Sequence, residues 1–404
     1  MIIRRWQEEE IKEALETMRV VMLVGARQTG KTTLAKYIVS DDCVYRTLDD
    51  LSALEAAKAD PMNFVKHNKK TMIIDEIQRV PELILAIKKV VDENPGDYGK
   101  YLITGSANIM ALPTVKESLA GRVAKIRLRP FTYGEIISNP PKFLKRLKNR
   151  DFIDNNGSDK KKTLELAFKG GFPEAINKSK PKRWYMDYIE ALVKSDLRNI
   201  ANIRRQDVLK RLIEVMSMYS SKFMDKKDIA GKLEINVQTL DEYLNILEKM
   251  YIIDKTYTWT KTDYQRIGKQ SHIFLNDTGL MSSILNWNFE NINLDADKTG
   301  KIIETYVYNQ LVAQVDLDYY TSLYHYRDWE KHEIDFIIET ENEVFGIDAK
   351  AGASTGRNDF KNLKWFSDKV PKDKKFTGVI LYTGEQVLAF GDNMYLVPIN
   401  NLWE

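Results

Sequence analysis

The chain has 404 residues, of which 43% are hydrophobic and 29% are charged, so it is long enough for two to four packed domains. Its 61 basic and 58 acidic side chains leave a net charge of only +3, which excludes an overall field favouring nucleic acid. A single cysteine, Cys43, excludes an intrachain disulfide. Because the sequence lacks a membrane-length apolar run and the apolar core of a signal peptide, we expect a cytoplasmic protein without membrane contact.

The first predicted strand and helix flank a glycine-rich loop in VVMLVGARQTGKTTLAKYIV, residues 20–39. In such a loop, glycines let backbone N–H groups turn toward phosphates, a lysine reaches the β- and γ-phosphates, and a threonine hydroxyl binds Mg²⁺. Lys31 and Thr32 stand at those positions. The pattern predicts that ATP is bound by Gly25, Gln28, Thr29, Gly30, Lys31, Thr32 and Thr33.

Two further apolar strands end in polar side chains of the kind that complete an ATPase site. KTMIIDEIQ ends in Asp75, predicted to hold Mg²⁺, and Glu76, predicted to orient or deprotonate the attacking water. GKYLITGSAN ends in Thr104, Ser106 and Asn108. We expect Ser106 to sense the γ-phosphate or hold the water, with Asn108 nearly as suitable.

Arg122 follows in ESLAGR. It is either an arginine finger that reaches the nucleotide of a neighbouring subunit or an arginine that pairs with a carboxylate.

These motifs resemble the AAA-type ATPases. The resemblance is to the bacterial and archaeal family that joins such a core to a C-terminal restriction-endonuclease-like domain of unknown function. GARQTGKTT, IIDEIQ, ITGSAN, LAGR, PFTYGE and GGFPEA stand in the order expected of that family, with Ala26 where proline is usual. The resemblance implies an α/β P-loop core with a parallel sheet and a nucleotide-driven homo-oligomer. It implies no substrate.

The middle of the chain is predicted to be helical. Residues 139–204 are interpreted as a helical lid and linker, with the Lys- and Asn-rich residues 142–163 as a solvated, mobile loop. Residues 205–288 have the helix–turn–helix–hairpin order of a winged helix. DNA binding would use the first turn of its second helix, and phosphates would be contacted by the wing, or else the module contacts protein. The residues concerned are Asn236, Gln238, Thr239, Lys261, Arg266 and Lys269.

The end of the chain contains EIDFIIETENEVFGIDAK, residues 333–350, where two apolar runs bracket a polar turn. A hairpin centred near 341 would place Asp335 beside Asp348, and Lys350 shares the face of Asp348. Carboxylates placed in this way suit Mg²⁺, and Glu304 from the preceding helix would complete the set.

This order resembles the PD-(D/E)xK nuclease pattern, with Glu333 as an alternative ligand. It implies a nuclease-like domain over residues 289–404, either active or used only for binding.

Together these patterns predict an α/β protein with an ATPase core over residues 1–138, followed by the lid, the winged helix and the nuclease-like domain. The predicted function is an Mg²⁺-dependent ATPase that couples its nucleotide state to DNA binding or cleavage. The alternative is a signalling ATPase switch that recruits protein partners without cleavage.

Overall fold

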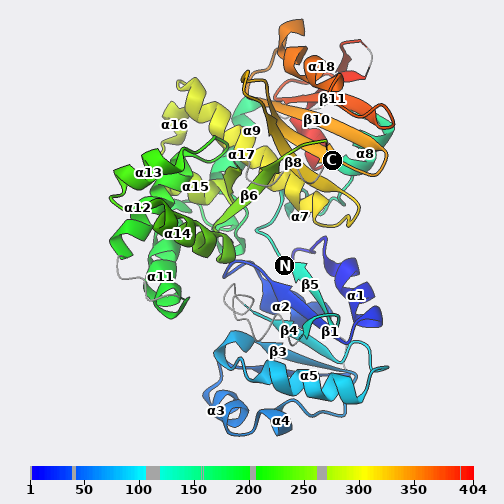
Figure 1. Ribbon diagram of the computed structural model, residues 1–404, viewed down its shortest axis with the longest axis vertical. Helices are drawn as coiled ribbons and strands as arrows, with labels where there is room; N and C mark the ends of the chain where they lie inside the picture. The colour runs from blue at the N-terminus through cyan, green and yellow to red at the C-terminus, as the bar shows by residue number, and fades with distance from the viewer. Residues whose placement is uncertain are drawn as a thin grey trace. The chain divides into compact units, whose positions relative to one another are not determined.

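The computed structural model divides the chain into two compact units, Met1–Pro130 with Lys249–Ile252, and Phe131–Glu248 with Ile253–Glu404 (Figure 1). Each unit is described by itself. Within the described part of the chain, no helix has the length and apolarity needed to cross a membrane. The described residues are 2–38, 42–105, 119–155, 157, 159–200, 206–261, 271–391 and 393–404.

The first unit is built on a five-stranded parallel sheet in the order β2-β3-β4-β1-β5. Every residue of β1 is buried, and alternate side chains enter two different cores, one packed against α5 and one against α1 and α2. Helices on both faces explain why this strand is continuously apolar. The elements are α1 (Glu8–Thr17), β1 (Val20–Val24), α2 (Lys31–Ile38), β2 (Cys43–Thr47), α3 (Leu51–Ala59), α4 (Pro61–Phe64), β3 (Thr71–Asp75), η1 (Ile77–Arg79), α5 (Leu83–Glu93), β4 (Tyr101–Thr104) and β5 (Val123–Arg127).

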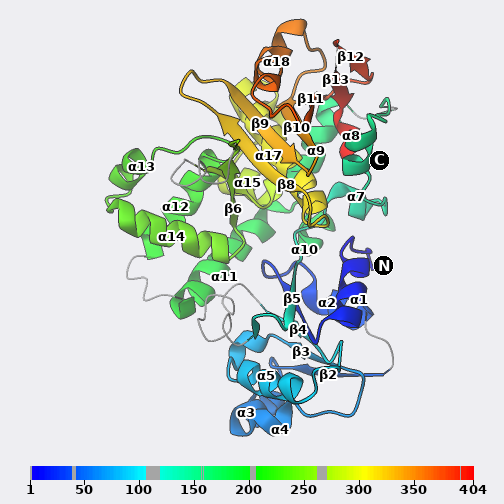
Figure 2. The same ribbon diagram turned by 45° about the vertical axis from the view of Figure 1, so that its right-hand side comes forward.

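The second unit begins with helices and ends in an eight-stranded mixed sheet (Figure 2). The sheet order is β12-β13-β11-β10-β9-β8-β6-β7. Its helices are α7 (Tyr133–Ile136), α8 (Phe143–Asn149), α9 (Lys160–Lys169), α10 (Pro173–Ile176), α11 (Lys182–Ile200), α12 (Gln206–Met218), α13 (Lys226–Lys232), α14 (Val237–Lys249), α15 (Thr278–Ile284), α16 (Phe289–Ile292), α17 (Ala296–Val315), η4 (Arg357–Phe360), α18 (Lys361–Ser367) and η5 (Ile399–Leu402). Its strands are β6 (Ile253–Thr258), β7 (His272–Leu275), β8 (Ser322–Arg327), β9 (Glu333–Glu339), β10 (Glu343–Lys350), β11 (Lys375–Tyr382), β12 (Leu388–Ala389) and β13 (Met394–Pro398).

Strands from both sides of the expected boundary between residues 288 and 289 share one sheet. The predicted wing strand β6 pairs with β8 of the expected nuclease-like domain through Tyr257–Tyr324 and Thr258–His325. The backbone amide of Trp259 also donates to the His325 carbonyl at 2.7 Å. This pairing therefore joins the helical module, α12 to α14, to the C-terminal sheet through β6.

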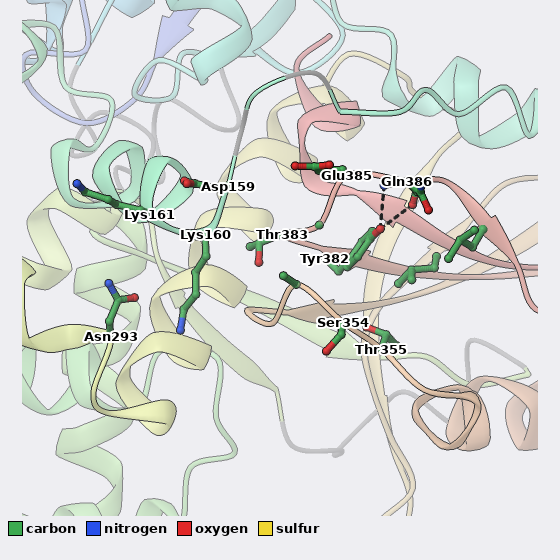
Figure 3. A pocket seen from close by; sticks show the side chains of 14 residues that line it. Asp159, Lys160, Lys161, Asn293, Ser354, Thr355, Tyr382, Thr383, Glu385 and Gln386 are labelled. Atoms are coloured by element: carbon green, nitrogen blue, oxygen red, sulfur yellow. Dashed lines mark hydrogen bonds between the residues drawn. The ribbon is translucent and has the colours of Figure 1, made fainter.

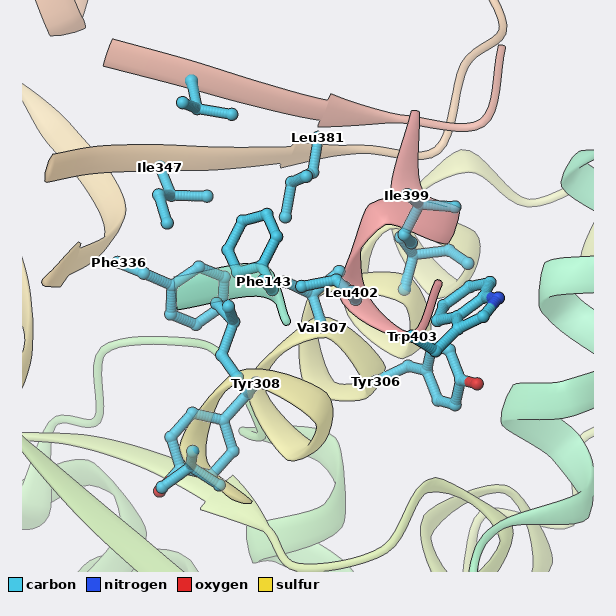
Figure 4. Packing of buried hydrophobic residues seen from close by; sticks show 14 of the residues in the cluster. Phe143, Tyr306, Val307, Tyr308, Phe336, Ile347, Leu381, Ile399, Leu402 and Trp403 are labelled. Carbon is cyan, nitrogen blue, oxygen red and sulfur yellow. The ribbon is translucent and has the colours of Figure 1, made fainter. Parts of the chain in front are cut away.

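Part of residues 142–163, which were predicted to form a mobile loop, is helical, because α8 covers Phe143–Asn149 and α9 begins at Lys160. Phe143 and Leu147 of α8 and Leu164 of α9 are fully buried and belong to the same core as α17 and the C-terminal strands (Figure 4). The amide of Phe143 also donates to the Gln314 carboxamide at 3.0 Å. Phe143 and Leu147 are spaced i, i+4, as on one face of a helix. The many lysine and asparagine residues around this short apolar pattern favoured the prediction of a loop.

The GGFPEA segment of the second unit surrounds a buried carboxylate. The amide of Gly171 donates to Asp277 at 2.6 Å, and that of Leu280 does so at 2.7 Å. A Cβ on Gly170, whose φ is +69°, would lie 2.4 Å from the same carboxylate. Gly170 is therefore needed for close packing around Asp277, whereas a Cβ on Gly171 would lie 2.1 Å from the Phe131 carbonyl oxygen. These two close approaches give the motif a structural explanation.

Candidate functional site

The glycine-rich loop leaves β1 and enters α2 with the backbone that the sequence pattern requires. Gly25 has φ +151° and approaches Leu128 so closely that a Cβ would lie 2.2 Å from the Leu128 carbonyl oxygen. Gly30 has φ +92°, and Gln28 also adopts a positive φ of 60°. Residues that carry a side chain rarely adopt positive φ values, so the two glycines are the residues that allow this loop conformation.

Lys31 lies at the start of α2 and is buried. Its Nζ donates to the carbonyl oxygens of Ala26 at 2.7 Å and Gly25 at 3.2 Å, both of which belong to the loop. Burial lowers the pKa of the Lys31 ammonium to about 8, although the charges of Glu76 and Asp75 oppose this shift. A buried cation held by neutral carbonyls is a natural partner for phosphate oxygens.

Asp75, at the carboxyl end of β3, receives hydroxyl groups from three different elements. Thr32 donates to its two carboxylate oxygens at 2.9 and 3.0 Å, and Tyr45 of β2 donates at 3.0 Å. Thr104, at the end of the adjacent strand β4, donates to Oδ1 of the same carboxylate. The arrangement forms because β4 lies between β1 and β3, so the carboxyl ends of these parallel strands meet at one edge of the sheet.

Glu76 follows Asp75 in the left-handed conformation, with φ +59°. Its amide donates to the Thr104 hydroxyl at 3.2 Å, and its carboxylate accepts a hydrogen bond from Gln78. A positive φ in a glutamate stores strain that is characteristic of functional sites. The other predicted residues of this region, Ser106 and Asn108, lie outside the described residues.

Arg122 immediately precedes β5, at the amino end of the parallel strands and thus at the opposite edge of the sheet from the loop. Its guanidinium forms a bidentate ion pair with Asp92 at the end of α5 and also donates to the Ala120 carbonyl at 3.0 Å. The hydrogen bond to Asp92 raises the pKa of Arg122. This position excludes contact with the nucleotide site of its own chain.

The second cluster lies at the open end of the β9–β10 hairpin, whose turn stands where the sequence predicts it. The last paired residues are Phe336 and Ile347, so Asp335 faces Asp348 one position further. At this position, hydrogen bonds from backbone amides to carboxylates take the place of the hydrogen bonds between the two backbones. The Asp335 amide donates to the Asp348 carboxylate at 3.1 Å, and the Ala349 amide donates to the Asp335 carboxylate at 2.8 Å. The two carboxylates are therefore fixed beside each other between diverging strands.

Glu304 approaches this pair from α17. Burial, followed by the charge of Asp335, raises the pKa of Glu304 well above its ordinary value, and the Ser221 hydroxyl offsets part of the rise. Burial also raises the pKa of Asp348 well above its usual range, with Asp335 adding to the shift and Lys350 opposing it. Carboxylates that repel one another in a buried site favour a bound cation.

The donor set at this cluster fits a hard cation. The described protein atoms include no hydrogen-bond partner for the buried Oε1 of Glu304, and carboxylate oxygens are the ligands that Mg²⁺ and Mn²⁺ prefer. The ligand atoms of Glu304, Asp335 and Asp348 do not all lie within 4.8 Å of one another. Among the described residues, the one group of three or more His, Cys, Asp or Glu side chains that meets this distance is Asp328, Glu330 and His332.

A loop that the sequence did not single out also reaches this cluster. Residues 219–223 lie in the connection between α12 and α13, and Ser220 is hydrogen-bonded to Thr305 of α17 at 2.8 Å. Ser221 has φ +66°, is buried, and its amide donates to the Ile273 carbonyl at 2.9 Å. Burial, followed by the charge of Asp335, raises the pKa of Glu333, and the charges of Arg327 and Lys222 oppose part of this rise. The helical module therefore contributes side chains to the carboxylate site, which spacing along the chain could not reveal.

The predicted DNA-contacting helix is α14. Gln238 is exposed, whereas the carboxamide of Asn236 accepts the Thr239 amide at 2.7 Å and so caps the helix. Lys261 is exposed, and Arg266 and Lys269 lie outside the described residues.

Residues 17–137 match a family model described as an AAA domain. Two further models, both described as domains of unknown function, DUF8612 and DUF4143, match residues 160–291 and 299–402. With the loop geometry and the parallel sheet, the first match supports an AAA-type P-loop α/β core, as the sequence predicts. The winged helix and the restriction-endonuclease-like domain stay predictions.

Uncharacterized proteins of Mycobacterium bovis (Mb2031c) and Mycobacterium tuberculosis (Rv2008c) are each 25% identical over 408 residues, covering 100% of this chain and 85% of theirs. Among solved structures, the RuvB Holliday junction branch migration motor of Thermotoga maritima shares 18% identity over 63% of this chain and 90% of its own, with a TM-score of 0.31. Cdc6p of Pyrobaculum aerophilum shares 13% over 70% and 93%, with a TM-score of 0.25. Scores this low establish no common overall fold.

Proposed function

We propose that this protein is an Mg²⁺-dependent ATPase that couples its nucleotide state to DNA binding, with a second, metal-dependent phosphodiester-cleaving site in its C-terminal sheet. The observation that carries the ATPase part is the meeting of Lys31, Thr32 and Asp75 at one sheet edge, where Thr32 donates to Asp75 at 2.9 Å. A buried lysine beside a hydroxyl–carboxylate pair is the arrangement that phosphoryl transfer requires.

In this proposal Lys31 binds the β- and γ-phosphates, and Thr32 and Asp75 hold Mg²⁺, which supplies charge neutralisation when bound. Thr104 positions Asp75 and Glu76 relative to each other, because its hydroxyl donates to the Asp75 carboxylate and accepts the Glu76 amide. Glu76 orients the attacking water and accepts its proton. Arg122 acts on the nucleotide of a neighbouring subunit in a homo-oligomer, after exchanging its ion pair with Asp92 for phosphate.

At the second site, Asp335, Asp348 and Glu304 would hold Mg²⁺ or Mn²⁺, which lowers the pKa of bound water. Lys350 lies two residues beyond Asp348 on β10, so both side chains share a face. Its ammonium stabilises a hydroxide or the charged phosphate. The helical module of α12 to α14 binds DNA and, through the loop of residues 219–223, contacts the same site.

The alternative function is a switch that recruits a protein partner without cleavage. It is favoured by the surface of α14, where Asp241 pairs with Lys226 at 2.6 Å and Glu248 pairs with Lys255 at 2.7 Å. The helix therefore presents acidic as well as basic side chains, whereas a DNA-contacting surface is mainly basic. Winged helices serve both purposes.

Cleavage of labelled single-stranded, duplex and branched DNA with Mg²⁺ or Mn²⁺, with and without ATP, separates the two functions. The test variant is Asp348→Ala with Lys350→Ala. The matched control is Asp373→Ala with Lys375→Ala, an Asp-x-Lys triplet that is exposed at the start of β11. We expect cleavage to be lost in the first variant and kept in the second. Absence of cleavage by the unmodified protein, alongside ATP hydrolysis, would leave the switch.

A further inference from the structure

A pocket of about 780 Å³ opens at the carboxyl ends of the parallel strands β10 and β11 (Figure 3). One wall is the loop that follows Lys350, with Ser354 and Thr355, and the opposite wall is the start of α9, with Lys160 and Lys161. Asn293, which lies just before α17, and Gln386 complete the polar lining. A volume within the range of about 300–1,000 Å³ is typical of ligand sites.

The pocket is held open by hydrogen bonds between the loops that form it. The Thr383 hydroxyl donates to the Ala351 carbonyl at 3.0 Å, which fixes the loop after Lys350. The Tyr382 hydroxyl donates to the Gln386 carbonyl at 2.7 Å and accepts the Gln386 amide at 3.0 Å, which closes the following turn. Because these hydrogen bonds tie the loop after Lys350 and the turn after β11 to the sheet, this side of the pocket is formed before any ligand arrives.

The lining has the donors that contact nucleic-acid backbones. Phosphate oxygens are bound by lysine, serine, threonine, asparagine and glutamine side chains and by helix N-termini. Lys160, Lys161, Ser354, Thr355 and Asn293 supply these groups. The Oγ1 of Thr355 is buried and has no hydrogen-bond partner among the described protein atoms. An orphaned hydroxyl in a polar pocket indicates a ligand with oxygen atoms.

The basic and acidic side chains that line the pocket differ in whether they have partners within the protein. In the described ranges, no carboxylate lies within ion-pair distance of Lys160 or Lys161. Of the two acidic residues, Asp159 caps α9 by accepting the Lys162 amide at 2.8 Å. Glu385 is exposed and opposes an anion. Lys160 and Lys161 therefore line the pocket without a carboxylate partner in the described ranges, and Glu385 is the acidic lining residue that caps no helix.

We propose that this pocket binds the phosphate backbone of a single DNA strand and leads that strand to the carboxylates of β9 and β10. The inference rests on the proposed function. Two segments connect the pocket to the carboxylate site: residues 351–356 follow Lys350 directly, and α17, which carries Glu304, begins three residues after Asn293. We take a single strand as the occupant because a volume of about 780 Å³ is that of a small-ligand site, which a duplex would not enter.

The test measures binding of a fluorescent oligodeoxythymidine to the full chain by anisotropy, across a series of salt concentrations. Lys160→Gln with Lys161→Gln should weaken binding about tenfold or more at low salt. It should also reduce the slope of log K against log salt by about 1.4, since each phosphate contact contributes about 0.7 for single strands. Glu385→Gln should strengthen binding. The matched control, Lys372→Gln with Lys375→Gln, removes two exposed lysines near the opposite end of β11 and should change neither quantity.

Normal binding by the Lys160→Gln, Lys161→Gln variant, while the unmodified protein binds the oligonucleotide, would overturn this inference and leave the proposed function intact. Failure of the unmodified protein to bind DNA at low salt would overturn both. Competition by ADP that is lost in the same variant would assign the pocket to a free nucleotide and would also overturn the inference.

Discussion

Thr104 provides the sharpest perturbation of the predicted ATPase site because it is fully buried and bonds to the Asp75 carboxylate and to the Glu76 backbone amide. Its hydroxyl donates to Asp75 and accepts the Glu76 amide at 3.2 Å. Thr104→Val keeps the shape of the side chain and removes both hydrogen bonds.

The bond to the charged Asp75 contributes about 1.5–3 kcal/mol and the neutral bond about 0.5–1.5 kcal/mol. We therefore expect Thr104→Val to lower the free energy of unfolding by about 2–4 kcal/mol. Because Asp75 and Glu76 lose their common support, kcat for ATP hydrolysis should fall by about 10- to 100-fold, while KM changes little. Thr104→Ser, which keeps the hydroxyl, should restore most of the activity.

The matched control is Thr71→Val at the other end of β3. Thr71 is also buried, and its hydroxyl donates to the Gly99 carbonyl at 2.8 Å, away from the predicted site. Steady-state phosphate release and chemical denaturation should show that this variant loses stability but keeps its kcat. Equal loss of kcat in both valine variants, or none in Thr104→Val, would refute the positioning role of Thr104.

Three further predictions concern charge. Burial lowers the pKa of Lys31 to about 8, so affinity for a fluorescent ATP analogue should fall about tenfold for each pH unit above that value; equal affinity at pH 7 and pH 9 would contradict this. Burial raises the pKa of Asp277 to about 6, so its contribution to stability is full below about pH 4 and is lost as the pH rises through 6, by about 3 kcal/mol. Asp277→Asn should remove that part of the pH dependence in denaturation experiments, and an unchanged pH profile would refute it. Glu304→Gln should raise thermal stability at neutral pH because it removes the cost of burying a carboxylate and, in addition, the repulsion from Asp335. Mn²⁺ should no longer stabilise this variant in thermal melts, and a metal-induced shift equal to that of the unmodified protein would refute the ligand role of Glu304.

Local patterns predicted the ATPase core well, because each signal there lies within a few residues of the group it positions. The strand-to-helix context of Lys31 and the apolar strand ending at Asp75 are of this kind, and the structure brings both together. Tyr45 also bonds to Asp75, but it was missed because nothing in its neighbourhood marks β2 as the strand beside β3.

The second unit was harder to predict because its organisation depends on long-range pairing. The hairpin that places Asp335 opposite Asp348 is local, and the sequence predicted it. The pairing of β6 with β8 and the burial of Phe143 join segments far apart in the chain. Ser221 reaches the carboxylate site only because Ser220 is fixed to Thr305, a contact without a sequence signature.

Phosphate release by the purified protein with Mg²⁺, measured with and without DNA and compared with Glu76→Gln, tests the central claim most directly. The account predicts ATP hydrolysis whose rate changes when DNA is added. In Glu76→Gln it predicts retained ATP binding and a loss of hydrolysis of about 100-fold or more. Hydrolysis at the same rate in the variant, or a rate that DNA leaves unchanged, would contradict it.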